Sequence, residues 1–280
     1  MQQAGKNVQF HITTRLIKWI ALVSMFCDHF AKIYLSAVLN GAVPGTGMWV
    51  AQHRGMLLSM YEGLQYFGRL AFPLFVFLLV EGFYLTRNRW KYLSRIILFG
   101  LISEIPFDMG FRFGNLAPSA GKLVEFSYQN VMFTLAIGLF AMIVIDLFLQ
   151  KTAYGSAGMV IAVLIAFAFI WLGNTLEVDY HGYGVASILI AYAVKTYAVK
   201  MRGANHTGQG QKNTETGWRI LEMGLLIIPL ILQSSNEAWA LLDVILVAFY
   251  YGKKGKPAHK WFFYIFYPAH LLFLVILRML

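Results

Sequence analysis

The stretch LIKWIALVSMFCDHFAKIYLSAVL, residues 16–39, decides the fold class. It is predominantly apolar over a length that crosses the hydrocarbon core of a bilayer, which takes about 20 residues of helix. Similar runs recur to the end of the chain, and we predict nine spans, at 16–39, 66–86, 90–109, 129–149, 157–173, 181–201, 218–233, 238–251 and 261–279. The sequence therefore predicts an all-α, polytopic transmembrane helical bundle in which residues 1–280 form a single domain.

The composition excludes a water-soluble enzyme. Of the 280 residues, 59% are hydrophobic and 13% are charged, and the charged share is about half that of an ordinary soluble chain. The single cysteine, Cys27, rules out an intramolecular disulfide. A net charge of +10 would suggest nucleic acid as a partner of a soluble protein, but here the placement of the charges between spans explains the excess, and no nucleic acid is expected.

The distribution of lysine and arginine predicts the orientation of the chain, because cytoplasmic loops accumulate these residues. With nine spans, 17 of the 23 fall on one side, which places the N-terminus inside: Lys6, Arg15, Lys18, Arg87, Arg89, Lys91, Arg95, Lys151, Lys195, Lys200, Arg202, Lys212, Arg219, Lys253, Lys254, Lys256 and Lys260. Segments 40–65 and 110–128 are then expected as outer loops, and 202–217 as a flexible inner loop.

Ionisable residues inside three predicted spans are candidates for a functional site, because each costs several kcal/mol in a bilayer unless it is paired or solvated. Counting about 1.5 Å of rise per residue brings five of them to similar heights in the outer half: Asp28, His29, Arg69, Glu104 and Asp108. Three further polar residues are expected near the mouth of this cluster, namely Asn130, Asp179 and His181. A purely structural ion network is the alternative interpretation.

Two carboxyl groups four residues apart repel each other when both are ionised, and Glu104 and Asp108 have this spacing. A cation is expected beside them, with Arg69 the first choice and His29 the second. Asp28 precedes Lys32 by four residues and is expected to be neutralised in part by it. An inner pair, Glu81 with Arg95, is expected to hold the hairpin between the second and third spans, with contact to an anionic substrate as the alternative.

His29 is the best candidate for a general base, since an imidazole of ordinary pKa can take a proton from an amine or hydroxyl nucleophile. His270, after Tyr267 and Pro268 in the last span, is a second candidate. No metal site is expected, because neither Asp28 with His29 nor Asp179 with His181 has ligand spacing on a helix. No G-x-x-x-x-G-K-[ST] and no G-x-S-x-G occurs in the chain, which argues against an ATP-driven pump and a serine hydrolase.

Several motifs in order along the chain resemble those of the TraX family, whose namesake acetylates the N-terminus of conjugative pilin. They are KWIALVSMFCDHFAKIY (18–34), FGRLAFPLFVFLLVEGFYLT (67–86), YLSRIILFGLISEIPFDM (92–109), QNVMFTLAIG (129–138), DYHGYGV (179–185) and FYIFYPAHL (263–271). The resemblance implies a membrane-embedded acyltransferase that moves an acetyl group from cytoplasmic acetyl-CoA to an amine or hydroxyl on the extracytoplasmic side. The acceptor would be a pilin-like N-terminus, a cell-surface glycan or a small molecule.

On this interpretation the chain is a multi-pass protein of the inner or cytoplasmic membrane. The expected catalytic residues are His29, Asp28, Glu104 and Asp108, and the expected residues for substrate or CoA binding are Arg69, Glu81, Arg95, Asn130, His181, Tyr267, His270 and Lys18. A different class of function remains open, namely a proton-coupled transporter or channel that uses the same buried acids as a relay.

Overall fold

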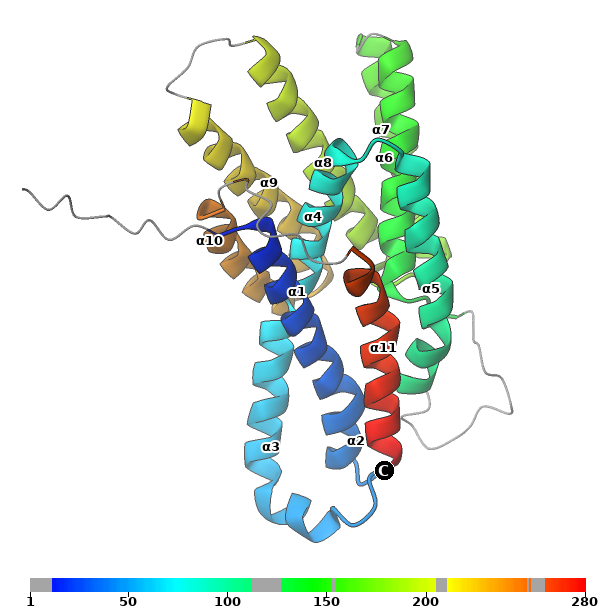
Figure 1. Cartoon of the computed structure of the whole chain (residues 1–280), viewed down its shortest axis with the longest axis vertical. Helices are drawn as coiled ribbons and strands as arrows, with labels where there is room; N and C mark the ends of the chain where they lie inside the picture. Colours follow the sequence, from blue (N-terminus) through cyan, green and yellow to red (C-terminus); the bar gives the residue numbers. More distant parts are fainter. Residues whose placement is uncertain (1–11, 112–126, 153–154, 205–210, 251, 253–259) are drawn as a thin grey trace, which may run out of the picture.

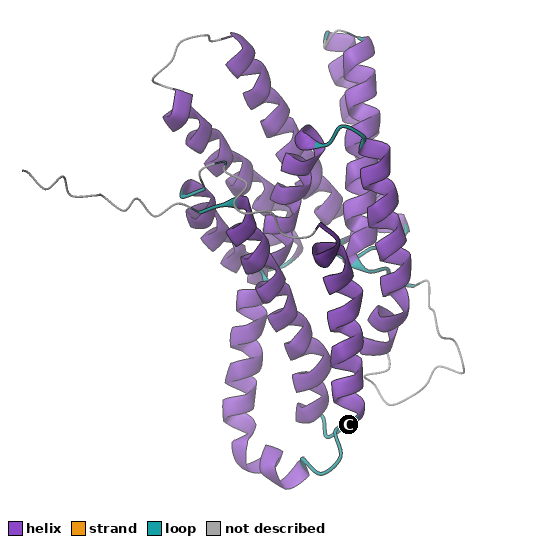
Figure 2. Cartoon of the chain, viewed as in Figure 1, coloured by secondary structure: helices purple, strands orange, loops and turns teal. Residues whose placement is uncertain are grey.

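The structure, a computed structural model, is a bundle of helices (Figure 2). It describes residues 12–111, 127–152, 155–204, 211–250, 252 and 260–280. Within these ranges the only β-type pairing consists of two isolated bridges, Ile12 with Tyr250 and Gln129 with Val178. The predicted all-α fold class is therefore confirmed.

The helices follow one another along the chain, with short turns between α3 and α4, α4 and α5, and α6 and α7. Their bounds are α1 Thr14–His29, η1 Phe30–Leu35, α2 Ser36–Leu39, α3 Gly47–Gly68, α4 Ala71–Leu85, α5 Arg89–Phe111, α6 Val131–Lys151, α7 Ser156–Thr175, α8 His181–Ala204, α9 Gln211–Gln233, η3 Ser235–Leu241, α10 Leu242–Ala248 and α11 Lys260–Met279. Polar side chains cap several of the N-termini: Thr13 accepts a hydrogen bond from the Leu16 amide, Asn88 accepts one from the Lys91 amide, and Asn130 accepts one from the Met132 amide.

Several of the described connections that carry basic residues lie in the same part of the bundle. The turn from α6 to α7 and the upper end of α8 are at the top of Figure 1, and the turn from α4 to α5 and the upper end of α9 lie below them in the upper part. The connection from α2 to α3 and the C-terminus lie at the bottom. This shared placement is what the distribution of lysine and arginine requires, while the direction of the bundle in a membrane stays a prediction.

The prediction of an outer loop over 40–65 is wrong. Residues Gly47–Gly68 form α3, which packs against α1 and η1 and continues the line of α4 toward the lower end (Figure 1). The polar residues Gln52, His53 and Arg54 interrupt the apolar sequence here, which is why no helix was predicted. The segment contains no proline, so its residues can still form a helix. The inner loop is also shorter than predicted, because α9 begins at Gln211; most of the 110–128 segment and of the basic 253–260 segment lies outside the described residues.

The count of nine spans is not confirmed. Six helical segments of the described chain are long and apolar enough to cross a membrane: Thr14–Leu39, Gly47–Leu85, Val131–Lys151, Ser156–Thr175, His181–Arg202 and Trp261–Met279. Helices α5 and α9 occupy the predicted third and seventh spans but are not among the six. The predicted span 238–251 is mostly the 3₁₀-helix η3 followed by the seven-residue α10, which is too short to cross about 30 Å of hydrocarbon.

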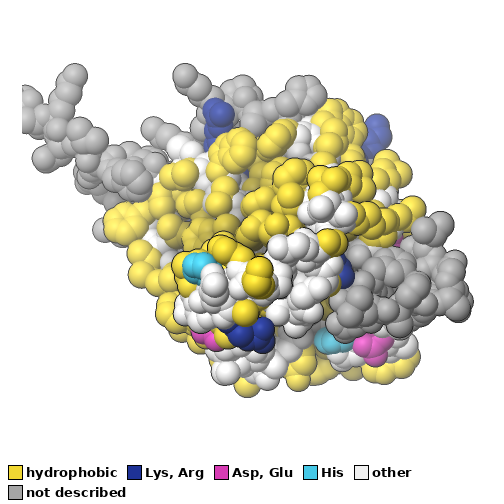
Figure 3. Space-filling view, turned by 90° about the horizontal axis from the view of Figure 1, so that it is seen from below, with side chains coloured by type: hydrophobic (Ala, Val, Ile, Leu, Met, Phe, Trp, Pro, Cys, Tyr) yellow, Lys and Arg dark blue, Asp and Glu magenta, His cyan; other side chains and the backbone are white. Residues whose placement is uncertain are grey.

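A break between α3 and α4 positions the functional site. Helix α3 ends at Gly68, and α4 begins at Ala71 with Pro73 in its first turn, a place where proline is tolerated. Beyond the break α4 runs through the core, and its Leu74, Phe77 and Phe83 side chains are fully buried. Seen from below, hydrophobic side chains surround a central area of polar and backbone atoms with a few separate charged side chains (Figure 3).

Candidate functional site

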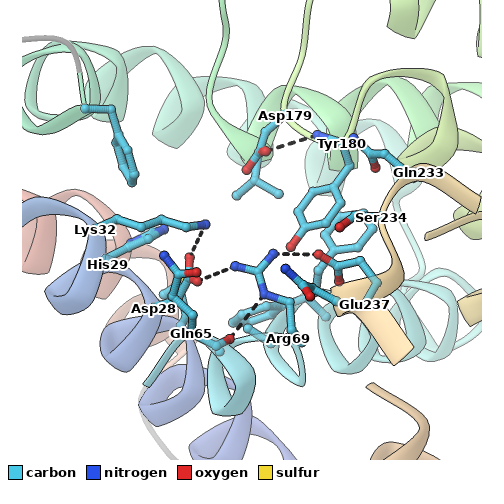
Figure 4. Close-up of a pocket in the computed structure, with 18 of the residues that line it drawn as sticks. Asp28, His29, Lys32, Gln65, Arg69, Asp179, Tyr180, Gln233, Ser234 and Glu237 are labelled. Atoms are coloured by element: carbon cyan, nitrogen blue, oxygen red, sulfur yellow. Dashed lines mark hydrogen bonds and ion pairs between the residues drawn. The ribbon is translucent and has the colours of Figure 1, made fainter. Parts of the chain in front are cut away.

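A cavity of about 530 Å³ lies at the break between α3 and α4. Its walls come from α1, η1, α3, α4, α5, α6, the end of α9, η3 and the turn between α7 and α8, so segments far apart in sequence converge on it (Figure 4). The ionisable side chains that line it are Asp28, His29, Lys32, Arg69, Tyr66, Tyr128, Asp179, Tyr180 and Glu237. The convergence of polar groups in a partly apolar cavity is typical of a binding or catalytic site.

Arg69 joins two carboxylates across the floor of this cavity. Its Nη2 lies 2.6 Å from Oδ1 of Asp28, and its Nη1 lies 2.5 Å from Oε1 of Glu237. Its Nε donates to the Gln65 carbonyl at 3.2 Å, which holds the guanidinium in place. Arg69 therefore links α1 to η3 instead of pairing with Glu104 or Asp108, and that prediction is wrong because the break in the helix presents Arg69 to α1 and η3.

Asp28 lies where α1 changes its winding. Residues Phe30–Leu35 form a π-helix, a rare conformation that frequently occurs at functional sites. Lys32 in this segment lies 2.7 Å from Oδ2 of Asp28, so the predicted pairing of these two residues is confirmed. A Cβ atom at Gly68 would lie 2.5 Å from the Cβ of Asp28, which shows that the approach of α3 to α1 at the site requires glycine.

Asp179 enters the cavity from the turn between α7 and α8, on the opposite side from Asp28 and Arg69 (Figure 4). Its Oδ1 accepts hydrogen bonds from the Tyr128 hydroxyl at 2.6 Å and from the Tyr180 amide at 3.0 Å. In the same turn Glu177, Tyr180 and His181 have φ values of 50°, 62° and 48°, a strained region for residues other than glycine. The turn therefore holds the Asp179 side chain in one orientation.

The charges that line the cavity do not balance. Three carboxyl groups, from Asp28, Asp179 and Glu237, face two cations, Lys32 and Arg69. Both cations are engaged by Asp28 or Glu237, and no lysine or arginine among the described residues lies within ion-pair distance of Asp179. Burial raises the pKa of Asp179, and the hydrogen bond from Tyr128 opposes that rise. A cationic group that entered the cavity would favour the ionised form of Asp179.

His29 borders the same cavity and contacts a second histidine behind it. Its Nδ1 lies 2.6 Å from Nε2 of His270, and the two rings are nearly parallel, with centroids 4.9 Å apart. The other nitrogen of His270, Nδ1, lies 2.8 Å from the Phe266 carbonyl. Phe111 and Tyr267 cover the His29 ring edge to face. The two predicted candidates for a base thus form one buried pair in which only His29 lines the cavity.

The remaining members of the predicted outer cluster lie outside the cavity wall. Glu104 and Asp108 of α5 are buried, and α5 contributes Phe107 and Phe111 to the cavity instead. The side-chain amide of Asn130 donates to Oε2 of Glu104 and, at 2.9 Å, to the Gly100 carbonyl. Glu104 therefore contacts the N-terminus of α6, and the structure brings Asp28, His29 and Arg69 together without the two acids of α5.

The residues expected toward the inner side do not make the predicted pair. Glu81 is bonded to Lys195 of α8, while the Arg95 guanidinium lies 6.0 Å from the Trp261 ring centroid. The number of residues from the end of each span predicted that Glu81 and Arg95 lie at similar height. In the structure α4 packs against α8 and presents Glu81 to it, whereas α5 packs against α11 and presents Arg95 to that helix. Lys18 lies over the Phe263 ring at 4.8 Å. His181, which was expected at the mouth of the outer cluster, does not line the cavity, and its Nδ1 lies 3.5 Å from Oε2 of Glu177.

Glu237, Tyr128 and Tyr180 line the cavity but were not among the predicted site residues. Glu237 lies between the predicted seventh and eighth spans, in a segment predicted to be a loop. An acidic residue is common in a loop, so it gave no sign of a functional site. Tyr128 and Tyr180 flank the predicted residues Asn130 and Asp179, so proximity to those residues was the available signal. The partners of all three depend on long-range packing that no local pattern encodes.

Comparison with known proteins gives one consistent result. The family model described as "TraX protein" matches residues 13–278. The curated "Probable fimbrial assembly protein FimC, serogroup H1" of Dichelobacter nodosus is 28% identical over 285 residues, with 98% of each chain covered. No solved structure matches the chain. Since the family match extends over nearly the whole sequence, this multi-pass membrane protein belongs to the TraX family.

Proposed function

We propose that this protein transfers an acetyl group from acetyl-CoA to an amine at the cavity beside His29. The observation that carries the proposal is the placement, in one cavity, of an imidazole that can accept a proton and a carboxyl group, Asp179, with no paired lysine or arginine among the described residues. The fimbrial relative supports an acceptor that belongs to a surface filament, such as the N-terminus of a pilin. The cytoplasmic membrane is the location that a CoA-dependent reaction would require.

The charge of the cavity favours an amine over a hydroxyl. Three carboxyl groups against two cations leave room for one positive charge, and a protonated amine would supply it. Asp179 is positioned by its hydrogen bonds from Tyr128 and from the Tyr180 amide to hold such a group by a charge-assisted hydrogen bond. A neutral glycan hydroxyl would bring no positive charge to pair with an ionised Asp179.

The reaction needs a base because a protonated amine is not a nucleophile. The ammonium group first loses one proton to give the free amine, and the amine nitrogen then attacks the carbonyl carbon of the thioester. His29 takes the proton that the nitrogen loses as the carbon–nitrogen bond forms. The carbon–sulfur bond breaks, the imidazolium of His29 gives its proton to the sulfur, and the CoA thiol leaves. The proton that the ammonium group lost at the start goes to water, so one proton in total is released for each acetyl group transferred.

The experiment is a measurement of free CoA thiol with purified protein in detergent. We expect thiol release from acetyl-CoA when a peptide with a free N-terminus is present, and none when the same peptide carries a blocked N-terminus. Asp179→Asn should weaken use of the free peptide, chiefly through a higher KM, because the charge that attracts the amine is lost. Absence of thiol release together with no acetyl-CoA-dependent rise in melting temperature would overturn the proposal and favour a transporter.

A further inference from the structure

The pair formed by His29 and His270 has hydrogen-bond partners that determine where its protons lie. The Phe266 carbonyl oxygen can only accept a hydrogen bond, and it lies 2.8 Å from Nδ1 of His270. Nδ1 of His270 therefore carries a proton. In a neutral imidazole the other nitrogen is then an acceptor, so Nε2 of His270 presents a lone pair to His29.

The same rule fixes the next ring. Nδ1 of His29 lies 2.6 Å from that acceptor, so it must carry the proton and donate it. This leaves Nε2 of His29 as the unprotonated nitrogen. Nε2 of His29 makes no hydrogen bond within the part of the chain that the structure describes, and His29 lines the cavity whereas His270 does not.

We infer that His270 is a positioning residue that fixes the tautomer of His29, so that Nε2 of His29 is the basic atom presented to the acceptor. The catalytic part of this inference rests on the proposed function, but the tautomer does not. When Nε2 takes a proton, the proton on Nδ1 can move along the hydrogen bond to His270, and the two rings then share one positive charge. No proton is gained or lost in that shift.

Packing keeps the two rings in the geometry that this relay requires. The interplanar angle between them is 4°, and His270 is also stacked on Phe266 at 15° with centroids 5.0 Å apart. Both histidines are largely buried, with 8% of His29 and 5% of His270 exposed. Helix α11 packs against η1 here, so the last helix of the bundle supplies the group that orients a residue of the first.

Substitutions at His270 separate its role as an acceptor from a role in packing. His270→Gln keeps an oxygen that can accept from Nδ1 of His29, whereas His270→Lys offers only donors and would force Nδ1 to become the unprotonated nitrogen. We expect His270→Gln to keep more than about a tenth of kcat. We expect His270→Lys to lose on the order of 10⁴-fold, the size of loss seen when a catalytic histidine is held in the wrong tautomer.

The direct readout is the ¹⁵N NMR spectrum of the histidine-labelled protein in detergent, with the His29 signals identified by their loss in His29→Gln. The parent and His270→Gln should show a protonated Nδ1 on His29, and His270→Lys should show a protonated Nε2. His53→Gln is the matched control, since His53 bonds the Trp49 carbonyl on its own helix α3 and does not line the cavity, so the substitution should leave kcat and the His29 signals unchanged. A protonated Nε2 on His29 in the parent, or equal kcat for His270→Gln and His270→Lys, would overturn the inference. If the spectra are as expected but the parent protein transfers no acetyl group, the proposed function is wrong and the inference about the tautomer still holds.

Discussion

Gly68 lies so close to Asp28 that a Cβ atom added to the glycine would be 2.5 Å from the aspartate Cβ and 2.9 Å from its Oδ1. The contact sets the distance between α3 and α1 at the point where Arg69 reaches Asp28. The small size of residue 68 is therefore part of the site, although its side chain carries no chemistry.

Gly68→Ala should destabilise the protein by about 1–3 kcal/mol through overpacking and should lower activity, because Asp28 must move away from Arg69. Gly63→Ala on the same helix is the matched control, since nothing lies within 4 Å of a Cβ there. That control should be neutral or stabilise α3, because alanine favours a helix over glycine by about 1 kcal/mol. Thermal unfolding in detergent compares the two, and equal melting temperatures for both variants would contradict the close approach.

Removal of Arg69 should be strongly destabilising. Arg69→Leu leaves the carboxylates of Asp28 and Glu237 near one another without their shared cation, and breaking a buried pair costs about 3–5 kcal/mol. Adding Glu237→Gln should recover part of the loss, because one uncompensated charge is removed. Arg54→Leu, at an exposed position of α3 that bonds the Leu39 carbonyl, is the control. No recovery in the double variant would show that Glu237 is not Arg69's partner.

The pair of Lys195 with Glu81 can be tested by a double-mutant cycle. Lys195→Met should lower the melting temperature because it leaves Glu81 without its cation, close to the buried Glu222. The double variant Lys195→Met/Glu81→Gln should be more stable than Lys195→Met alone. Additive losses in the cycle would mean that the two residues act independently, and a cycle on Glu81 with Arg95 should show no coupling.

The sequence predicted which residues are helical far better than which residues touch. Apolar length located α6, α7, α8 and α11, because a bilayer demands such runs. It did not locate most of α3, because polar residues interrupt the apolar sequence of this helix, which packs beside α1 and η1. Height along each span brought Asp28, His29 and Arg69 together correctly, but the rotation of a helix about its axis depends on its neighbours. The break between α3 and α4 determines that Arg69 contacts Glu237, and the rotation of α4 determines that Glu81 contacts Lys195.

The predicted orientation can be tested by cysteine labelling in intact cells, in a Cys27→Ser background that removes the native thiol. Asn40 and Asn88 lie at opposite ends of the bundle, between α2 and α3 and between α4 and α5 respectively. Asn40→Cys should react with an impermeant reagent from outside, and Asn88→Cys should react only after permeabilisation. The reverse pattern would invert the bundle and place the basic ends outside.

The account depends most on His29 as the base, and the rate of acetyl transfer by purified His29→Gln tests it most directly. The parent, His29→Gln and His53→Gln are compared with acetyl-CoA and a peptide amine, and acetyl-CoA binding is measured separately. We predict that His29→Gln loses about 10²–10⁴-fold in rate, the range for a general base, while it binds acetyl-CoA like the parent and His53→Gln is unaffected. A His29→Gln protein that keeps more than about a tenth of the parent rate, above the residual activity expected after loss of a general base, would contradict the account.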